Sequence, residues 1–176
     1  MFNSIRAWLG LEGAAGPEPA PLRELVDALD RLEPGRARHL ARFAYLLGRV
    51  ADADRVVTKE ETAKMESLLQ AQGGLSADQA MLVVALARTS NQLFGGTADF
   101  QVAHEFAETT SYEEKLALAR CLFAVAAADA HISPAEETEV HRITNQLHIR
   151  PQDLLQIRMM YRRFLPGLSA PDPPET

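Results

Sequence analysis

Apolar residues recur with a helical period throughout residues 22–165, and no run alternates polar and β-branched residues as a strand would. This pattern predicts an all-α fold. Residues 22–32, 36–51 and 98–108 follow the period clearly. With the helices whose starts are marked by caps, they predict a bundle of about seven to eight helices.

Four helix starts are marked by a hydroxyl residue followed three positions later by Glu or Gln, the pattern of a capping box. The pairs are Thr58–Glu61, Ser76–Gln79, Ser111–Glu114 and Ser133–Glu136. Glycine pairs at 73–74 and 95–96 predict helix ends, and Pro151 predicts the first turn of the last helix.

Two segments are apolar enough to form the centre of the core. Residues 116–128 are apolar on almost every side, which predicts the central buried helix. Residues 81–86 form the second segment. We expect the two to pack together, with alanines allowing close approach.

Glycines and prolines separate the helical body from both ends of the chain. Residues 1–21 are expected to hold an N-terminal amphipathic stripe and a flexible linker. Residues 22–165 are expected to form the helical domain, and the Pro-rich residues 166–176 a disordered tail.

The N-terminal stripe places Phe2, Ile5, Trp8 and Leu9 on one arc of a helix. It could contact a membrane surface peripherally, bind a partner, or pack on its own domain. Arg6 is its only nearby charge, so the electrostatic part of membrane anchoring is missing. No stretch approaches the roughly 20 apolar residues that span a bilayer.

Composition narrows the function classes. The 176 residues carry 18 Lys plus Arg against 24 Asp plus Glu, a formal net charge of −6 that makes a nucleic-acid partner unexpected. The single cysteine, Cys121, excludes an internal disulfide framework and the multi-cysteine zinc motifs. It fits a reducing compartment, so a cytoplasmic location is expected.

An internal repeat is the most informative feature of the sequence. Nine positions recur at a constant offset: Leu47, Val50, Ala51, Ala53, Asp54, Val57, Thr58, Glu61 and Met65 match Leu122, Val125, Ala126, Ala128, Asp129, Ile132, Ser133, Glu136 and Val140. Each copy reads as an apolar helix, an Ala-Asp turn, an aliphatic residue and a capped second helix. This predicts a duplicated helix-turn-helix hairpin with pseudo-twofold symmetry.

Such symmetry would bring four carboxylates together, namely Asp54, Glu61, Asp129 and Glu136. Oxygen ligands suit calcium, magnesium or manganese, so a divalent cation is the candidate cofactor. The spacing differs from that of an EF-hand. Acids at these positions also cap and stabilise helix N-termini without a metal, and both interpretations stay open.

Other residues carry weaker candidate chemistry. His104–Glu108 and Glu137–His141 are spaced as mixed ligands or as surface ion pairs, and His131 could add a ligand. Cys121 lies in an apolar helix and is expected to be a structural thiol. Without a Gly-x-Ser-x-Gly or phosphate-loop motif, we expect no enzymatic activity.

Arginines gather on two predicted helices. The first group, on or near residues 36–51, is Arg36, Arg38, Arg42 and Arg49, and the second group, on the last helix, is Arg158, Arg162 and Arg163. They could dock an acidic protein, a lipid headgroup or RNA, or form ordinary solvated faces. A metal-free adaptor that binds a protein partner through these arginine faces or the N-terminal stripe is therefore the alternative function.

The repeated motif Ala-Asp-x-x-[Val/Ile]-[Thr/Ser]-x-x-Glu, at residues 53–61 and 128–136, resembles that of the TerB domain. This domain occurs in tellurite-resistance proteins and in the N-terminal region of membrane-anchored DnaJ-like co-chaperones. The resemblance implies a pseudo-twofold helical bundle, an acidic patch for divalent cations, and a stress-related role in protein or membrane-associated complexes. Family members often carry glycine after the aspartate, whereas Arg55 and Ala130 stand here, and a side chain opposes a left-handed turn.

Overall fold

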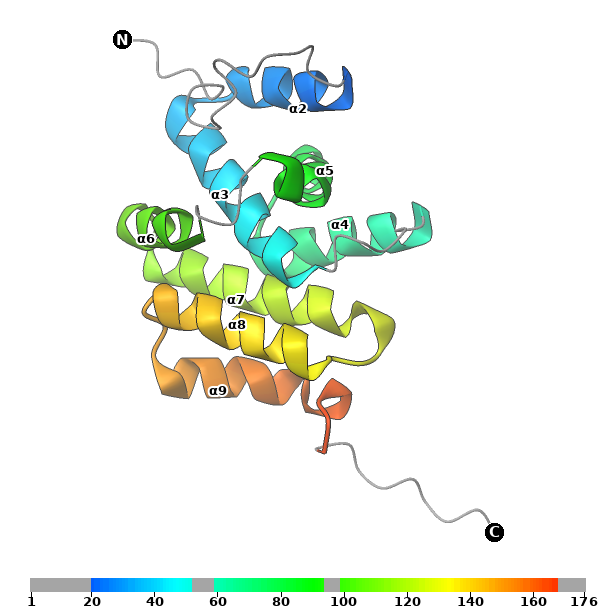
Figure 1. Ribbon diagram of the computed structural model, residues 1–176, viewed down its shortest axis with the longest axis vertical. Coiled ribbons are helices and arrows are strands. Elements are labelled where there is room, and N and C mark those ends of the chain that lie inside the picture. Colours follow the sequence, from blue (N-terminus) through cyan, green and yellow to red (C-terminus); the bar gives the residue numbers. More distant parts are fainter. Residues whose placement is uncertain (1–19, 52–58, 94–98, 168–176) are drawn as a thin grey trace.

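The computed structural model describes residues 20–51, 59–93 and 99–167, and these residues form helices and no strands, which confirms the predicted all-α fold. Two 3-10 turns, η1 (Ala127–Asp129) and η2 (Arg162–Phe164), follow α7 and α9. The helices are α2 (Ala20–Asp30), α3 (Pro34–Val50), α4 (Lys59–Gly73), α5 (Ala77–Leu93), α6 (Asp99–Thr109), α7 (Tyr112–Ala126), α8 (Pro134–Gln146) and α9 (Pro151–Met160). They pack as the predicted bundle (Figure 1).

Capping fixes most of the helix starts that the sequence predicts. Reciprocal capping boxes open α7 at Ser111 and α8 at Ser133. At Ser76, the backbone N–H donates to Gln79 Oε1 (3.3 Å) and the hydroxyl accepts from the Gln79 N–H (3.2 Å). Pro151 opens α9, and α4 ends at Gly73 as expected. Thr58 and the glycines at 95–96 lie outside the described residues.

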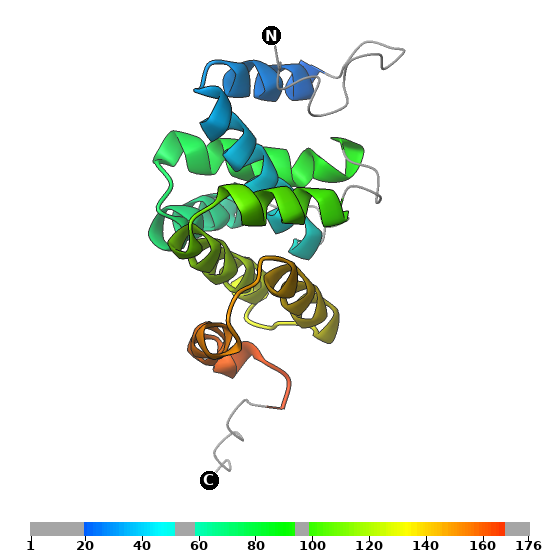
Figure 2. The same cartoon turned by 90° about the vertical axis from the view of Figure 1, so that its left-hand side faces the viewer.

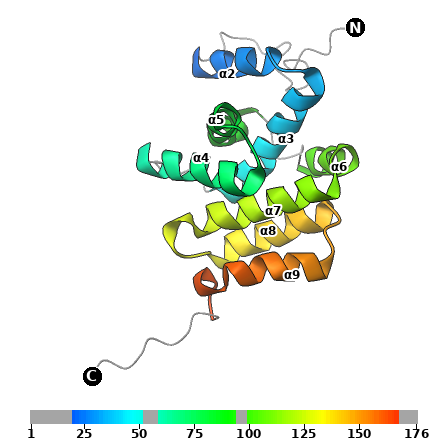
Figure 3. The same cartoon turned by 180° about the vertical axis from the view of Figure 1, so that it is seen from behind.

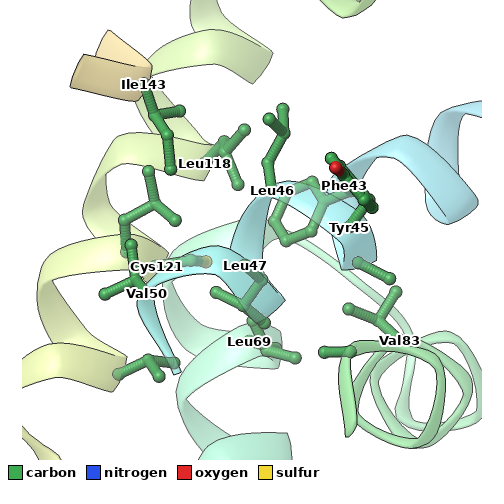
Figure 4. Packing of buried hydrophobic residues seen from close by; sticks show 14 of the residues in the cluster. Phe43, Tyr45, Leu46, Leu47, Val50, Leu69, Val83, Leu118, Cys121 and Ile143 are labelled. Atoms are coloured by element: carbon green, nitrogen blue, oxygen red, sulfur yellow. The ribbon is translucent and has the colours of Figure 1, made fainter. Parts of the chain in front are cut away.

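α3 crosses the middle of the bundle and packs against α5, α6, α7 and α8 (Figure 1). Its side chains Phe43, Leu46 and Leu47 meet those of the surrounding helices in one apolar cluster (Figure 4). α7 is buried from Leu118 to Ala126 apart from Arg120, which confirms that this segment is a buried apolar helix.

The expected packing of α5 against α7 is wrong. α5 packs chiefly on α3 and α4, because α3 supplies the apolar surface that the 81–86 segment covers. Met81 itself faces outward and is exposed. Alanine-rich helices offer several equivalent close approaches, so composition alone does not select the partner.

α7, α8 and α9 lie side by side at the end of the bundle away from α2 (Figures 1 and 3). Both α8 and α9 pack on α7, and Figure 2 shows α8 beside α7 and α9, seen along its axis, below it. α4 packs on α7, and α8 packs on α3. These two contacts would be equivalent in a duplicated hairpin, because α3 and α4 would correspond to α7 and α8. Since residues 52–58 lie outside the described residues, the duplication stays a prediction.

Residues 1–19 and 168–176 also lie outside the described part, so the N-terminal stripe and the Pro-rich tail stay predictions. Within the described part, each helix is too short or too polar to cross a bilayer.

Candidate functional site

The acidic turn, defined as residues 128–136, connects α7 to α8. It begins in η1 and passes through Ala130, whose backbone is left-handed at φ 61° and ψ 16°. The Ala130 N–H donates to Ala127 O at 3.0 Å and closes the turn. The left-handed turn forms here although the alanine side chain opposes it, at a cost of about 1–2 kcal/mol.

Buried and capping residues hold the rest of the acidic turn. Ile132 is fully buried, and its N–H donates to Phe164 O at 2.8 Å, which ties the turn to η2. The Ser133 N–H donates to Glu136 Oε2 at 2.8 Å, and the Glu136 N–H donates to Ser133 Oγ at 3.2 Å. One oxygen of Glu136 is therefore engaged in helix capping, the role that its spacing also predicts.

α4 reaches the acidic turn from the other half of the bundle. The Lys64 ammonium donates to Ala128 O at 2.6 Å, directly before Asp129 in the chain. Glu61 stands three residues before Lys64 on the same helix, so the helix that carries the third predicted ligand lies against this turn. The contact also places a positive charge of the protein itself beside the predicted cation site.

The four predicted metal ligands are only partly described. Asp129 is exposed and Glu136 is half-buried, whereas Asp54 and the side chain of Glu61 lie outside the described residues. In residues 20–51, 59–93 and 99–167, no three or more His, Cys, Asp or Glu side chains gather to hold a metal ion. The described residues thus supply two carboxylates of the set, and His131 stands exposed beside them.

In the candidate pairs His104–Glu108 and Glu137–His141, one residue of each pair contacts a residue outside the pair. Glu137 accepts from Arg158 Nε and lies 2.7 Å from Arg158 Nη2, while His141 Nε2 is 3.9 Å away. This carboxylate therefore forms its close ion pair with Arg158, between α8 and α9, and only a long contact with His141, the partner that the spacing predicts. The His104 ring stacks on Phe100, with ring centroids 6.0 Å apart.

In the first arginine group, the side chains of Arg42 and Arg49 are largely buried. Arg42 Nη2 is 2.7 Å from Glu105 Oε2, Arg49 Nη2 is 2.6 Å from Glu139 Oε1, and Arg36 Nη2 donates to Gln79 Oε1 at 2.8 Å. Arg42 and Arg49 are one heptad apart and share the face of α3 that packs on α6 and α8. A spacing of seven residues places two side chains on one face of a helix, so it indicates that these arginines share an environment.

Cys121 is a buried thiol, as its apolar helix predicts. Burial raises its pKa to about 12, so the thiol stays protonated near neutral pH. A Cβ at Gly73 would lie 3.0 Å from Cys121 Sγ, which explains why a glycine allows α4 to approach α7 here.

A hydrogen-bond network of Tyr112, Arg150 and Asp153 joins α7 to α9. No local pattern in the sequence indicates this contact. The Tyr112 hydroxyl donates to Asp153 Oδ2 at 2.6 Å and accepts from the Arg150 backbone N–H at 3.0 Å. Arg150 Nε donates to the same Asp153 oxygen at 2.7 Å. These hydrogen bonds hold the Asp153 pKa below its usual range, the Tyr112 contribution being the largest.

The helical bundle and its acidic turn define a helical module with carboxylates at one interhelical turn. A model of the family described as "Tellurite resistance protein TerB" matches residues 39–159, more than half of the chain. The chain therefore belongs to the TerB family. Searches of curated proteins and of solved structures give no significant match.

Proposed function

We propose that this chain is a non-enzymatic, cytoplasmic TerB-like module of a stress or tellurite-resistance system. It binds a divalent cation at the acidic turn and engages a protein or membrane-associated complex. Membership of the TerB family is the observation that carries this proposal. The buried, protonated Cys121 supports a non-enzymatic role, because a nucleophilic thiol needs exposure and a lowered pKa.

The proposed cation is calcium, magnesium or manganese, because the candidate ligands are carboxylates. Asp129 and Glu136 would supply two of them, and Asp54 and Glu61 would complete the set. The contact of Lys64 with Ala128 O supports this assignment, since it brings α4, which carries Glu61, to the acidic turn.

A metal-free adaptor is the second candidate function, and two contacts favour it. The Lys64 ammonium already supplies a positive charge at the acidic turn, and the capping box engages Glu136. In this function the acids stabilise helix ends, and a protein partner binds through exposed arginines or the N-terminal stripe.

Thermal unfolding with calcium, magnesium, manganese or EDTA separates the two functions. A ligand of the native state at one hundred times its Kd adds about 2.7 kcal/mol. We expect a cation-specific rise in Tm that Asp54→Asn/Asp129→Asn abolishes and that Lys64→Met enlarges, because a like charge is removed. Asp27→Asn/Asp30→Asn on α2 is the control with the same change in net charge.

If no cation raises the Tm of the wild type or of Lys64→Met, the cation site is contradicted. The metal-free adaptor would then be the remaining candidate function. An equal rise in the wild type and in Asp54→Asn/Asp129→Asn would place the ion elsewhere.

Peripheral membrane contact through Phe2, Ile5, Trp8 and Leu9 is tested separately. Full-length wild type and the Ile5→Gln/Trp8→Gln variant are sedimented with phosphatidylserine-containing vesicles. We expect less pelleting of the variant, because the apolar stripe drives insertion. Equal pelleting would remove the stripe from the proposal.

A further inference from the structure

The solvent side of α9 carries three large apolar side chains beside two exposed glutamines. Leu155, Met159 and Met160 are 55%, 45% and 61% exposed, and they make up most of the large apolar side chains exposed in the described residues. Leu155 and Met159 are four residues apart and share one side of the helix, opposite the buried Leu154 and Ile157. We call these three exposed residues the α9 face. A surface helix normally carries polar residues on this side.

The fold does not need the α9 face to hold α9 in place. At the start of the helix, Asp153 and Arg150 are tied to Tyr112 of α7. At its end, Tyr161 stacks on Phe123, with centroids 5.7 Å apart, and the Phe164 carbonyl accepts from the Ile132 N–H. The α9 face is thus presented on a helix that is anchored at both ends, and such preorganisation lowers the entropic cost of binding.

Positive charges stand at both ends of the α9 face, although the whole chain is acidic. Arg162 and Arg163 are exposed just after the helix, and the Arg150 side chain is 60% exposed just before it. Asp153 pairs with Arg150 and Glu137 pairs with Arg158, so the net positive charge beside the α9 face comes from Arg162 and Arg163 at its end. Local charge therefore favours an acidic ligand.

This charge pattern decides among possible occupants. A second copy of the chain, docked about a twofold axis, would bring arginine-flanked surfaces together and meet like-charge repulsion. An amphipathic helix buries its apolar stripe on such a surface and can place acidic residues against the arginines. Methionines suit this mode of binding because they adapt to the shape of the partner.

We propose that the α9 face docks an amphipathic helix of a partner protein, whose apolar stripe is flanked by Asp and Glu. The inference rests on the partner-binding part of the proposed function and is independent of the cation. Leu155 and Met159 fill the apolar contact, and Arg162 and Arg163 select the acidic flanks.

The test uses a displayed library of random peptides of about 20 residues, long enough for a helix of about 30 Å. Peptides are selected on the full-length chain and on its Leu155→Gln/Met159→Gln variant. Met81→Gln, which changes an exposed methionine on α5, is the matched control. We expect the wild type and the control to enrich amphipathic, acid-flanked peptides that the variant binds at least about tenfold more weakly.

Charge is tested with Arg162→Glu/Arg163→Glu, which we expect to weaken the same peptides and to remove most of the salt dependence of their binding. Adding EDTA or the Asp129→Asn change is expected to leave peptide binding unaltered, so failure of the cation site and failure of docking are distinguishable. Each variant is first checked for wild-type Tm.

Three outcomes would overturn the proposal. In the first, the selected peptides show no enrichment in Asp and Glu, or they bind the wild type and Leu155→Gln/Met159→Gln with equal affinity. Another is sedimentation equilibrium showing a dimer that this variant abolishes, which would make the occupant a second copy. The last is binding to phosphatidylserine vesicles that requires Leu155 and Met159 while no peptide is enriched, which would make it a membrane surface.

Discussion

α3 and α9 both combine apolar residues with arginines, yet the bundle uses them in opposite ways. α3 is surrounded by α5, α6, α7 and α8, and its Arg42 and Arg49 point inward to carboxylates. α9 packs mainly on α7 and leaves Leu155, Met159 and Met160 in solvent. The number of neighbouring helices, more than the composition of either helix, decides which side chains are buried.

The comparison also separates two uses of arginine. On α3, a largely buried guanidinium needs a paired carboxylate, because an isolated charge in the core is costly. At the end of α9, Arg162 and Arg163 are exposed and lie at the surface of the bundle. Arginines clustered in a sequence therefore indicate a binding surface only when their helix lies at the edge of the fold.

The largest expected contrast is between two leucine truncations. Leu46→Ala in α3 removes a fully buried side chain and is expected to lower the free energy of unfolding by about 2–5 kcal/mol. Leu155→Ala on the exposed side of α9 is expected to change it by no more than about 0.5 kcal/mol. Urea denaturation measures both. A large cost at Leu155 would mean that the α9 face is covered in solution.

A smaller contrast comes from two glutamates on α8. Glu139 pairs with Arg49 of α3, whose side chain is 8% exposed, and Glu137 pairs with Arg158 of α9, whose side chain is 26% exposed. Glu139→Gln leaves the more deeply buried charge and is expected to cost about 1–3 kcal/mol. Glu137→Gln is expected to cost about 1 kcal/mol or less. Equal losses in urea denaturation would contradict the inner and outer roles assigned to the two arginines.

The elements of the fold were predictable because their signals are local. Capping residues at Ser76, Ser111 and Ser133 and the proline at 151 each act within one helical turn, and the structure places helices where they indicate. The packing of α5 was not predictable in the same way. Its apolar surface fits either α3 or α7, and only the three-dimensional arrangement selects α3.

The candidate site was predictable in part. The capping role of Glu136 follows from its spacing to Ser133, and the structure confirms it. The Lys64 contact with Ala128 and the Tyr112 contact with Asp153 join residues far apart in the sequence, so no local pattern could indicate them. The left-handed Ala130 was missed because tertiary anchoring at Ile132 can outweigh a backbone preference of this size.

Ala130 offers a still smaller test, at the turn that joins the inner helix α7 to α8. Ala130→Gly relieves the left-handed strain but adds freedom to the unfolded chain, so a net stabilisation of up to about 1 kcal/mol is expected. Ala135→Gly, in the exposed first turn of α8, is the control and is expected to destabilise by up to about 1 kcal/mol. A loss of stability in Ala130→Gly would show that the left-handed backbone carries no strain.

The smallest expected effect is the pH dependence of the clamp between α7 and α9. The folded-state pKa of Asp153 is lowered, first by the hydrogen bond from Tyr112 and then by Arg150, so its stabilisation is present above the unfolded pKa near 4. It is lost as the pH falls below that value toward the folded pKa. Tyr112→Phe is expected to raise the Asp153 pKa in an NMR titration and to reduce the loss of Tm between pH 6 and pH 3, while Tyr161→Phe leaves both unchanged. α3 is buried continuously from Leu40 to Gly48, whereas the start of α9 is held by this clamp. An unchanged titration of Asp153 in Tyr112→Phe would therefore mean that packing alone fixes the outer helix.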